Sequence, residues 1–126
     1  MNAKELQALR KFLMLDVREA AEIIGGVSKR SWQYWEAGRS PVPQDVADKM
    51  EGLLTVRQTV LERLEAEALD YSDNPQDEHG ERLRVPFYPT LAEFAAAHPE
   101  DGRLLTWRCH QSAAAELYAS NLIRLE

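Results

Sequence analysis

The stretch that decides the fold is DVREAAEIIGGVSKRSWQYWEAGRSP, residues 16–41. Asp16 stands three residues before Glu19, which is the spacing of a helix capping box, and apolar residues then recur at helical intervals. Gly25 and Gly26 follow and predict the end of this helix. The stretch therefore begins with a short amphipathic helix that ends in a tight turn.

A second short helix is predicted over residues 29–37, because Ser28 is a capping residue and Gly38 is a helix terminator. At 3.6 residues per turn, Trp32 and Trp35 share one side of it and indicate a buried face. The opposite face carries Lys29, Arg30, Gln33 and Tyr34. Such a helix fits the major groove of DNA, where Arg, Lys and Gln match the hydrogen-bonding edges of guanine and adenine.

The flanking residues extend this helical pattern. Residues 2–15 have the apolar spacing of an amphipathic helix, and a long helix is predicted over 44–70, after the break at Pro41 and Pro43. Arg57 occupies one position of the apolar stripe of the long helix, where an apolar residue would be expected. This organisation predicts a helical domain over 1–70.

The remainder reads as a turn-rich acidic linker over 71–84 and a small α+β region over 85–126. Within that region we expect a strand at 85–88, a helix at 91–97 capped by Thr90, a strand at 103–109, a helix at 112–120, and a tail at 122–126 that is either a short strand or frayed. The predicted fold class is mainly α, with an α+β C-terminal region.

Composition limits the alternatives. A chain of 126 residues with 44% hydrophobic content can build one full core or two small ones. Because there is no run of about 18 uncharged apolar residues, we expect a soluble, cytoplasmic protein. Cys109 is the only cysteine, so no intramolecular disulfide can form, and its apolar surroundings favour a buried structural thiol.

Charge is unevenly distributed along the chain, whose formal net charge is -6. Residues 1–43 carry seven Lys or Arg and five Asp or Glu, whereas the rest carries eight bases and sixteen acids. An acidic body with a basic end favours one orientation against a polyanion such as DNA. The alternative is that the acidic part merely has a well-solvated surface.

No catalytic or metal constellation is visible. His79, His98 and His110 lie in separate segments without a second ligand at metal-binding spacing, and there is no glycine-rich phosphate loop or nucleophile elbow. We therefore expect neither an enzyme nor a bound metal or cofactor.

The order DVREAAEIIGG–VSKRSWQYWEAGRSPVP resembles the helix-turn-helix of the phage-repressor and Cro-like group, with Gly25 and Gly26 where one glycine is usual. A closer resemblance covers nearly the whole chain. The blocks KELQALRKFLMLDVREAAEIIG, VSKRSWQYWEAGRSPVPQDV, RVPFY and TWRCHQSAAAELY are similar to the YdiL-like and anti-CRISPR-associated (Aca) regulators. This resemblance implies a small homodimeric DNA-binding protein that represses its own operon, with a C-terminal part that completes the dimer.

The resemblance also assigns roles to residues. Those expected to contact DNA are Ser28, Lys29, Arg30, Ser31, Gln33, Tyr34, Arg39, Ser40 and Arg18. Arg30 is the candidate for a guanine, and Ser28 serves either as a helix cap or as a phosphate ligand, the cap being favoured. Trp32 and Trp35 are structural, and Glu36 is expected to pair with Arg10.

The C-terminal region is expected to hold the dimer, because its short elements offer more apolar surface than they can cover alone. The residues concerned are Phe94, Leu104, Leu105, Trp107, Leu117 and Tyr118. The alternative is that they form a local core with the long helix.

Three functional hypotheses follow. The first is a sequence-specific DNA-binding repressor that reads an inverted repeat as a dimer, since one short helix contacts too few base pairs to locate an operator. The second is a protein-interaction module of an antitoxin-like kind, which uses the acidic region and exposed aromatic residues. The third is an RNA-binding regulator in which Tyr34 and the neighbouring cations hold a hairpin.

Overall fold

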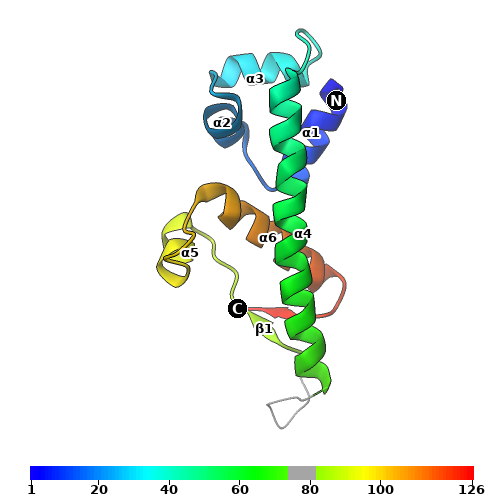
Figure 1. Ribbon diagram of the computed structural model, residues 1–126, viewed down its shortest axis with the longest axis vertical. Coiled ribbons are helices and arrows are strands. Elements are labelled where there is room, and N and C mark those ends of the chain that lie inside the picture. Colours follow the sequence, from blue (N-terminus) through cyan, green and yellow to red (C-terminus); the bar gives the residue numbers. More distant parts are fainter. Residues whose placement is uncertain (74–81) are drawn as a thin grey trace. The chain divides into compact units, whose positions relative to one another are not determined.

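The computed structural model describes residues 1–73 and 82–126 and is mostly helical, with one small sheet (Figure 1). The predicted fold class is confirmed. The chain divides into two compact units, residues 1–55 and 56–126, and the boundary falls inside the long helix α4, Gln44–Asp73. The predicted domain 1–70 thus spans this boundary, since the second half of α4 packs with the C-terminal elements. Of the predicted linker, residues 74–81 lie outside the described part.

The first unit holds short helices with strong local caps. These are α1 (Ala3–Phe12), α2 (Val17–Glu19), η1 (Ala20–Gly25) and α3 (Lys29–Glu36). The predicted capping box at Asp16 and Glu19 is confirmed: the amide of Glu19 donates to Asp16 Oδ1 at 2.7 Å, and the amide of Asp16 donates to Glu19 Oε1 at 3.0 Å. Asn2 and Glu5 form a second capping box at the start of α1.

The turn between η1 and α3 is set by glycines. The segment expected to continue as an α-helix is a π-helix, η1, whose wider turns take up an additional residue. Gly26 ends it in the left-handed conformation, with φ 61°. Gly25 is required for a different reason: a Cβ there would lie 3.0 Å from Val27 Cγ2 and 3.2 Å from each of the rings of Trp32 and Trp35. The glycine pair therefore brings α3 close against η1.

The core of the first unit is built from α1, η1, α3 and the first turns of α4. Its most buried side chains are Leu6, Leu13, Ala20, Ala21, Ile24, Trp32, Val46 and Met50. Burial of these apolar side chains stabilises the unit and fixes α3 from one side only.

The second unit combines the rest of α4 with β1 (Arg84–Val85), α5 (Leu91–Ala97), α6 (Leu104–Ala119) and β2 (Arg124–Leu125). The two strands are parallel, and Arg84 pairs with Arg124 and Val85 with Leu125. The core comprises Val60, Leu61, Leu64, Ala68, Val85, Ala113, Ala114, Leu117 and Ile123. Among the described residues, no helix is both long and apolar enough to cross a membrane.

The strand predicted over 103–109 is wrong, because this segment is the start of α6. Trp107, His110, Ala114 and Leu117 recur every three or four residues and are all buried, so the helical period runs through the point where the sequence suggested a break. The helix predicted over 112–120 is the second half of α6. The capped helix over 91–97 is confirmed as α5, and Thr90 Oγ1 accepts from the amide of Glu93.

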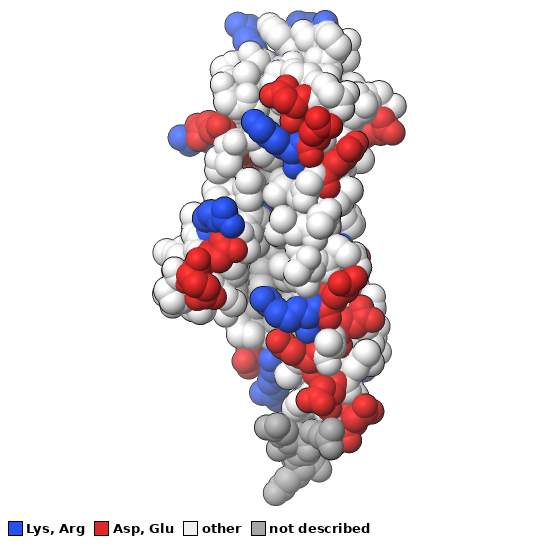
Figure 2. All heavy atoms as spheres, in the orientation of Figure 1, with Lys and Arg blue, Asp and Glu red and all other residues white. Residues whose placement is uncertain are grey.

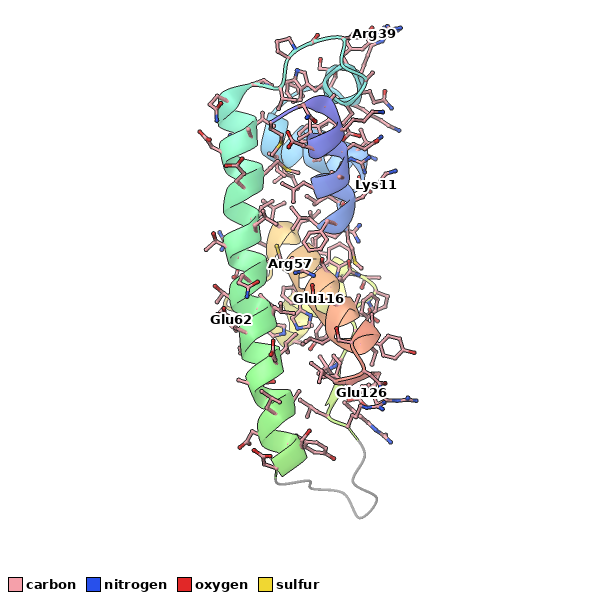
Figure 3. The ribbon with its side chains drawn as sticks, turned by 90° about the vertical axis from the view of Figure 1, so that its right-hand side faces the viewer. Lys11, Arg39, Arg57, Glu62, Glu116 and Glu126 are labelled. Carbon is pink, nitrogen blue, oxygen red and sulfur yellow. The ribbon has the colours of Figure 1, made fainter. Side chains whose placement is uncertain are left out.

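A buried arginine ties α4 to α6. Arg57 is 5% exposed, and its Nε donates to Ser112 Oγ at 2.8 Å while its Nη2 lies 3.1 Å from Glu116 Oε1. Figure 3 shows Arg57 and Glu116 pointing toward each other between the two helices. The charge on the apolar stripe of α4 is thereby compensated by hydrogen bonds and a carboxylate.

Cys109 is buried in α6, in agreement with a structural thiol. Burial raises the pKa of Cys109 to about 11, so the thiol is protonated at neutral pH.

Candidate nucleic-acid interface

The outward face of α3 carries the predicted reading residues. Ser28 caps the helix, its Oγ accepting from the amide of Ser31 at 3.1 Å, which confirms the capping role. Lys29, Arg30 and Gln33 are exposed, and the Ser31 side chain is half-buried. Hydrogen-bond donors thus gather on the first two turns of the helix, beside the positive end of its dipole.

The inward face of α3 is aromatic. Trp32 is fully buried and Trp35 is 9% exposed, and their ring centroids lie 5.4 Å apart with planes inclined at 59°. These rings pack toward η1, where Gly25 leaves room for them. Trp32 and Trp35 thus form the predicted buried face and Lys29, Arg30 and Gln33 the exposed one, whereas Tyr34, predicted to be exposed, is half-buried.

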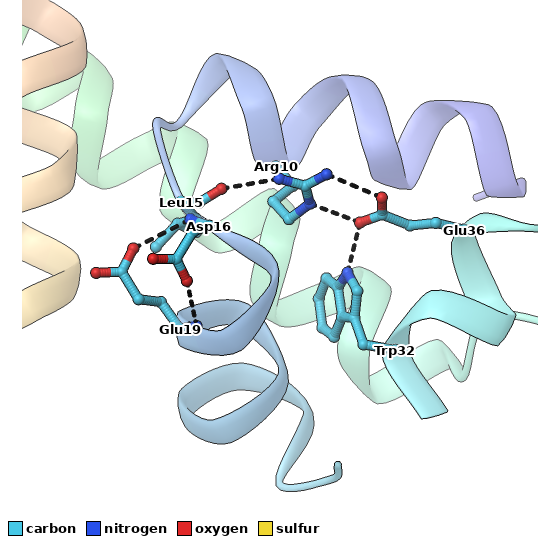
Figure 4. A network of polar contacts seen from close by, with 6 residues as sticks. All are labelled: Arg10, Leu15, Asp16, Glu19, Trp32 and Glu36. Atoms are coloured by element: carbon cyan, nitrogen blue, oxygen red, sulfur yellow. Dashed lines mark hydrogen bonds and ion pairs between the residues drawn. The ribbon is translucent and has the colours of Figure 1, made fainter. Parts of the chain in front are cut away.

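A buried ion pair joins α3 to α1 (Figure 4). Arg10 Nε donates to Glu36 Oε2 at 2.7 Å and Arg10 Nη2 to Glu36 Oε1 at 3.0 Å, so the predicted pair is confirmed and is bidentate. Arg10 Nη1 also donates to the carbonyl of Leu15 at 3.0 Å. The same carboxylate accepts from Trp32 Nε1.

The hydrogen bonds decide the charge state of Glu36. Burial by itself raises the pKa of this carboxyl, but the hydrogen bonds from Arg10 and Trp32 outweigh burial and hold the pKa below its ordinary value of 4.5. The link from Trp32 to Glu36 was not foreseen from the sequence, although their spacing of four residues on one helix is the signal that points to it.

Tyr34 is half-buried, and its ring lies close to two arginines that are predicted to contact DNA. The guanidinium carbon of Arg30 lies 6.0 Å from the centroid of the Tyr34 ring, and that of Arg39 lies 5.4 Å away. Both arginines are exposed (Arg39 is labelled in Figure 3). A ring face attracts a guanidinium at this range, so Tyr34 restricts both side chains beside the donor face.

The remaining predicted contacts lie outside α3. Arg18, in α2, pairs with Glu22 at 3.1 Å, with both side chains largely exposed. Such a surface ion pair contributes little to stability, so Arg18 can exchange Glu22 for a phosphate group at little cost. Ser40 is half-buried after the helix, where its amide donates to the carbonyl of Tyr34.

Charge differs between the two parts of the chain. Lys29, Arg30 and Arg39 are exposed at or just after α3, and within the described part of the chain none of them forms an ion pair. Figure 2 shows acidic side chains spread along α4 instead. A polyanion therefore meets less repulsion at α3 than along α4.

The residues predicted to form a dimer lie in different environments. Phe94, Trp107 and Leu117 are buried within a single chain, as the alternative of a local core expects. Leu104 and Leu105 are half-buried, and Tyr118 is 52% exposed. Of the six, these last three retain surface that a partner can cover.

No group of three or more His, Cys, Asp or Glu side chains in residues 1–73 and 82–126 is arranged to hold a metal ion. The site on α3 consists of hydrogen-bond donors, cations and one aromatic ring.

Comparison with known proteins identifies the family of the chain. The family model described as Aca2/YdiL-like matches residues 1–126. The chain is 48% identical over 118 residues to the Aca2 repressor of Pectobacterium phage ZF40, covering 94% of this chain and 93% of that protein. It is 37% identical over 126 residues to the uncharacterised protein YdiL of Escherichia coli K12, covering 99% of each. The family resemblance expected from the sequence is confirmed, and the chain belongs to the Aca2/YdiL-like family.

Proposed function

We propose that this protein is a transcriptional repressor that binds double-stranded DNA through α3. The observation that carries the proposal is the exposed donor face of Lys29, Arg30 and Gln33 on a helix anchored by two buried tryptophans. The 48% identity to a protein named as a repressor supports the same function.

The chemistry of this face suits the major groove. Arg30 is proposed to donate hydrogen bonds from two guanidinium N–H groups to guanine O6 and N7, and Gln33 is proposed to bind adenine. Lys29, Arg39 and Arg18 are proposed to neutralise phosphates, together with the hydroxyls of Ser31 and Ser40. Ser28 is engaged as the helix cap and contributes through the amide groups that it orders at the start of α3.

The proposed active form is a homodimer that binds an inverted repeat and represses its own operon. One helix reads only a few base pairs, whereas two helices about 34 Å apart read two half-sites on one face of the duplex. We place the dimer contact in the second unit, at Leu104, Leu105 and Tyr118, which keep accessible surface. Phe94, Trp107 and Leu117 would support these residues from within the core.

Arg30→Ala is expected to weaken binding to DNA from the protein's own promoter by about 10- to 100-fold, because a bidentate contact to guanine is worth roughly 1–3 kcal/mol. Fluorescence anisotropy at one fixed salt concentration measures this change. The matched control is Arg124→Ala, which removes an exposed arginine from β2 and should leave binding unchanged. If Arg30→Ala binds as tightly as the unmodified protein, the proposed reading face is wrong.

Competition experiments separate the other hypotheses from this one. Displacement of the promoter duplex by a structured RNA, but not by unrelated duplex DNA, would favour an RNA-binding regulator. Absence of any DNA binding at low salt would favour a protein-interaction module, since the phosphate contribution is largest there.

A further inference from the structure

The second unit contains a polar hollow that the proposed function does not use. It comprises two neighbouring cavities of about 380 and 250 Å³, and Arg63, His98, Glu100 and His110 line both. Its walls come from α4, from β1 and the residues around it, from α5 and the residues that follow it, and from α6. Aromatic rings with a few polar groups are the usual lining of a small-molecule site.

Four rings meet at this hollow. His98 stacks on Phe94 with centroids 4.5 Å apart and planes inclined at 26°, and His110 lies 5.6 Å from Phe94 and 5.8 Å from His98. Tyr88 lies 5.5–5.7 Å from these three rings. Such a cluster offers ring faces and edges to a planar ligand.

His110 is a buried polar group without a partner. Its side chain lines both cavities, the residue is 4% exposed, and within residues 1–73 and 82–126 its Nδ1 has no hydrogen bond. Buried polar atoms in folded proteins are nearly always hydrogen-bonded, so an unpartnered one at a cavity calls for an explanation. A bound polar molecule supplies one.

The charges at the hollow limit what that molecule can be. Arg63 is exposed and makes no hydrogen bond or ion pair with the described residues, so its guanidinium is available to a carboxylate. Glu100 lines both cavities, and Glu67 and Arg84 line the larger one, so two carboxylates offset two arginines and repulsion from the carboxylates grows with each negative charge on a ligand. Asp101, in the smaller cavity, is already paired with Arg103 at 2.7 Å.

We infer that this hollow binds a small aromatic monocarboxylate, whose carboxylate pairs with Arg63 and whose ring packs against Phe94, His98 and Tyr88. The imidazole of His110 provides a polar contact at the inner wall. The site lies wholly in the second unit, and its occupation does not depend on the proposed reading face of α3.

Benzoate is the probe that tests this inference on the full chain. A titration followed by the ¹H–¹⁵N NMR spectrum should show saturable binding, with a dissociation constant on the order of 1 mM or below for a ligand of this size. The shifted amides should lie around His98 and His110. Benzamide, which lacks the charge, and phenyl phosphate, which carries more charge, should each bind about tenfold more weakly or worse.

Arg63→Gln should weaken benzoate binding by about tenfold or more. Arg63 is exposed, so this variant should fold, and an unchanged spectrum away from the hollow verifies that. Arg124→Gln, at an exposed arginine outside the lining of both cavities, is the matched control and should bind like the unmodified chain. Three results overturn the inference: no saturation at about 20 mM benzoate, equal affinity of Arg63→Gln and the unmodified chain, or equal losses in both arginine variants.

Discussion

Arg10→Met is expected to lower the free energy of unfolding by about 3–5 kcal/mol, because it leaves the carboxylate of Glu36 buried without its countercharge. Both side chains of the pair are less than 10% exposed. Of the contacts that Figure 4 draws around Glu36, only the hydrogen bond from Trp32 would remain in this variant. Urea denaturation followed by tryptophan fluorescence measures the change, since Trp32 and Trp35 lie in the same unit.

Lys11→Met is the matched control, because Lys11 is the exposed neighbour of Arg10 on α1 (Figure 3). It should change the stability by no more than about 0.5 kcal/mol. Arg10→Met combined with Glu36→Met should recover a large part of the loss, since removing both charges avoids the unpaired one. A loss below about 1 kcal/mol in Arg10→Met would contradict a buried, coupled pair.

The same ion pair connects stability with the proposed function. Arg10 holds Glu36, Glu36 accepts from Trp32, and Trp32 is the side chain that seats α3 in the first unit. The orientation of the exposed donor face therefore depends on Arg10 of α1, which binds Glu36 and does not lie on that face. We expect Arg10→Met to weaken DNA binding only to the extent that it unfolds the unit or loosens α3.

The capped short helices of the fold could be predicted because their determinants are local. Ser28, Asp16 and Thr90 each cap a helix by accepting from an amide three residues along the chain, and that relation is visible in the sequence. The buried and exposed faces of α3 follow equally from a period of 3.6 residues.

Features that depend on tertiary packing could not be predicted in the same way. Residues 103–109 contain β-favouring types in a short apolar run, and only their packing against the rest of the second unit identifies them as helix. The π-helical turns before Gly26 and the approach of two guanidinium groups to the Tyr34 ring are likewise fixed by backbone geometry that residue types do not specify.

The domain boundary shows the same limit. The helical pattern of α4 continues from the first unit into the second, and Arg57, which occupies one position of the apolar stripe near the boundary, does not by itself mark the end of a unit. The stripe indicates that the helix is buried on one side, but not which partners cover each half.

Lowering the pH from 7 to 5 is expected to reduce the free energy of unfolding by about 2 kcal/mol through His110 alone. Burial, with smaller contributions from the charges of His98 and Arg63, lowers the pKa of His110 from 6.5 to about 4. The unfolded chain then binds a proton between these two values while the folded chain does not. This contribution is therefore complete above about pH 6.5 and is lost as the pH falls toward 4. Urea denaturation at several pH values measures it.

His110→Phe is the variant that isolates this effect, because it keeps a ring in the cluster with Phe94 and Tyr88 and removes the titrating group. Its stability should change much less between pH 7 and 5 than that of the unmodified chain. The lowered pKa of Glu36 does not interfere, since its contribution is lost only below about pH 4.5. An equally steep fall in both proteins would show that other groups cause the acid sensitivity and that His110 readily accepts a proton in the folded state.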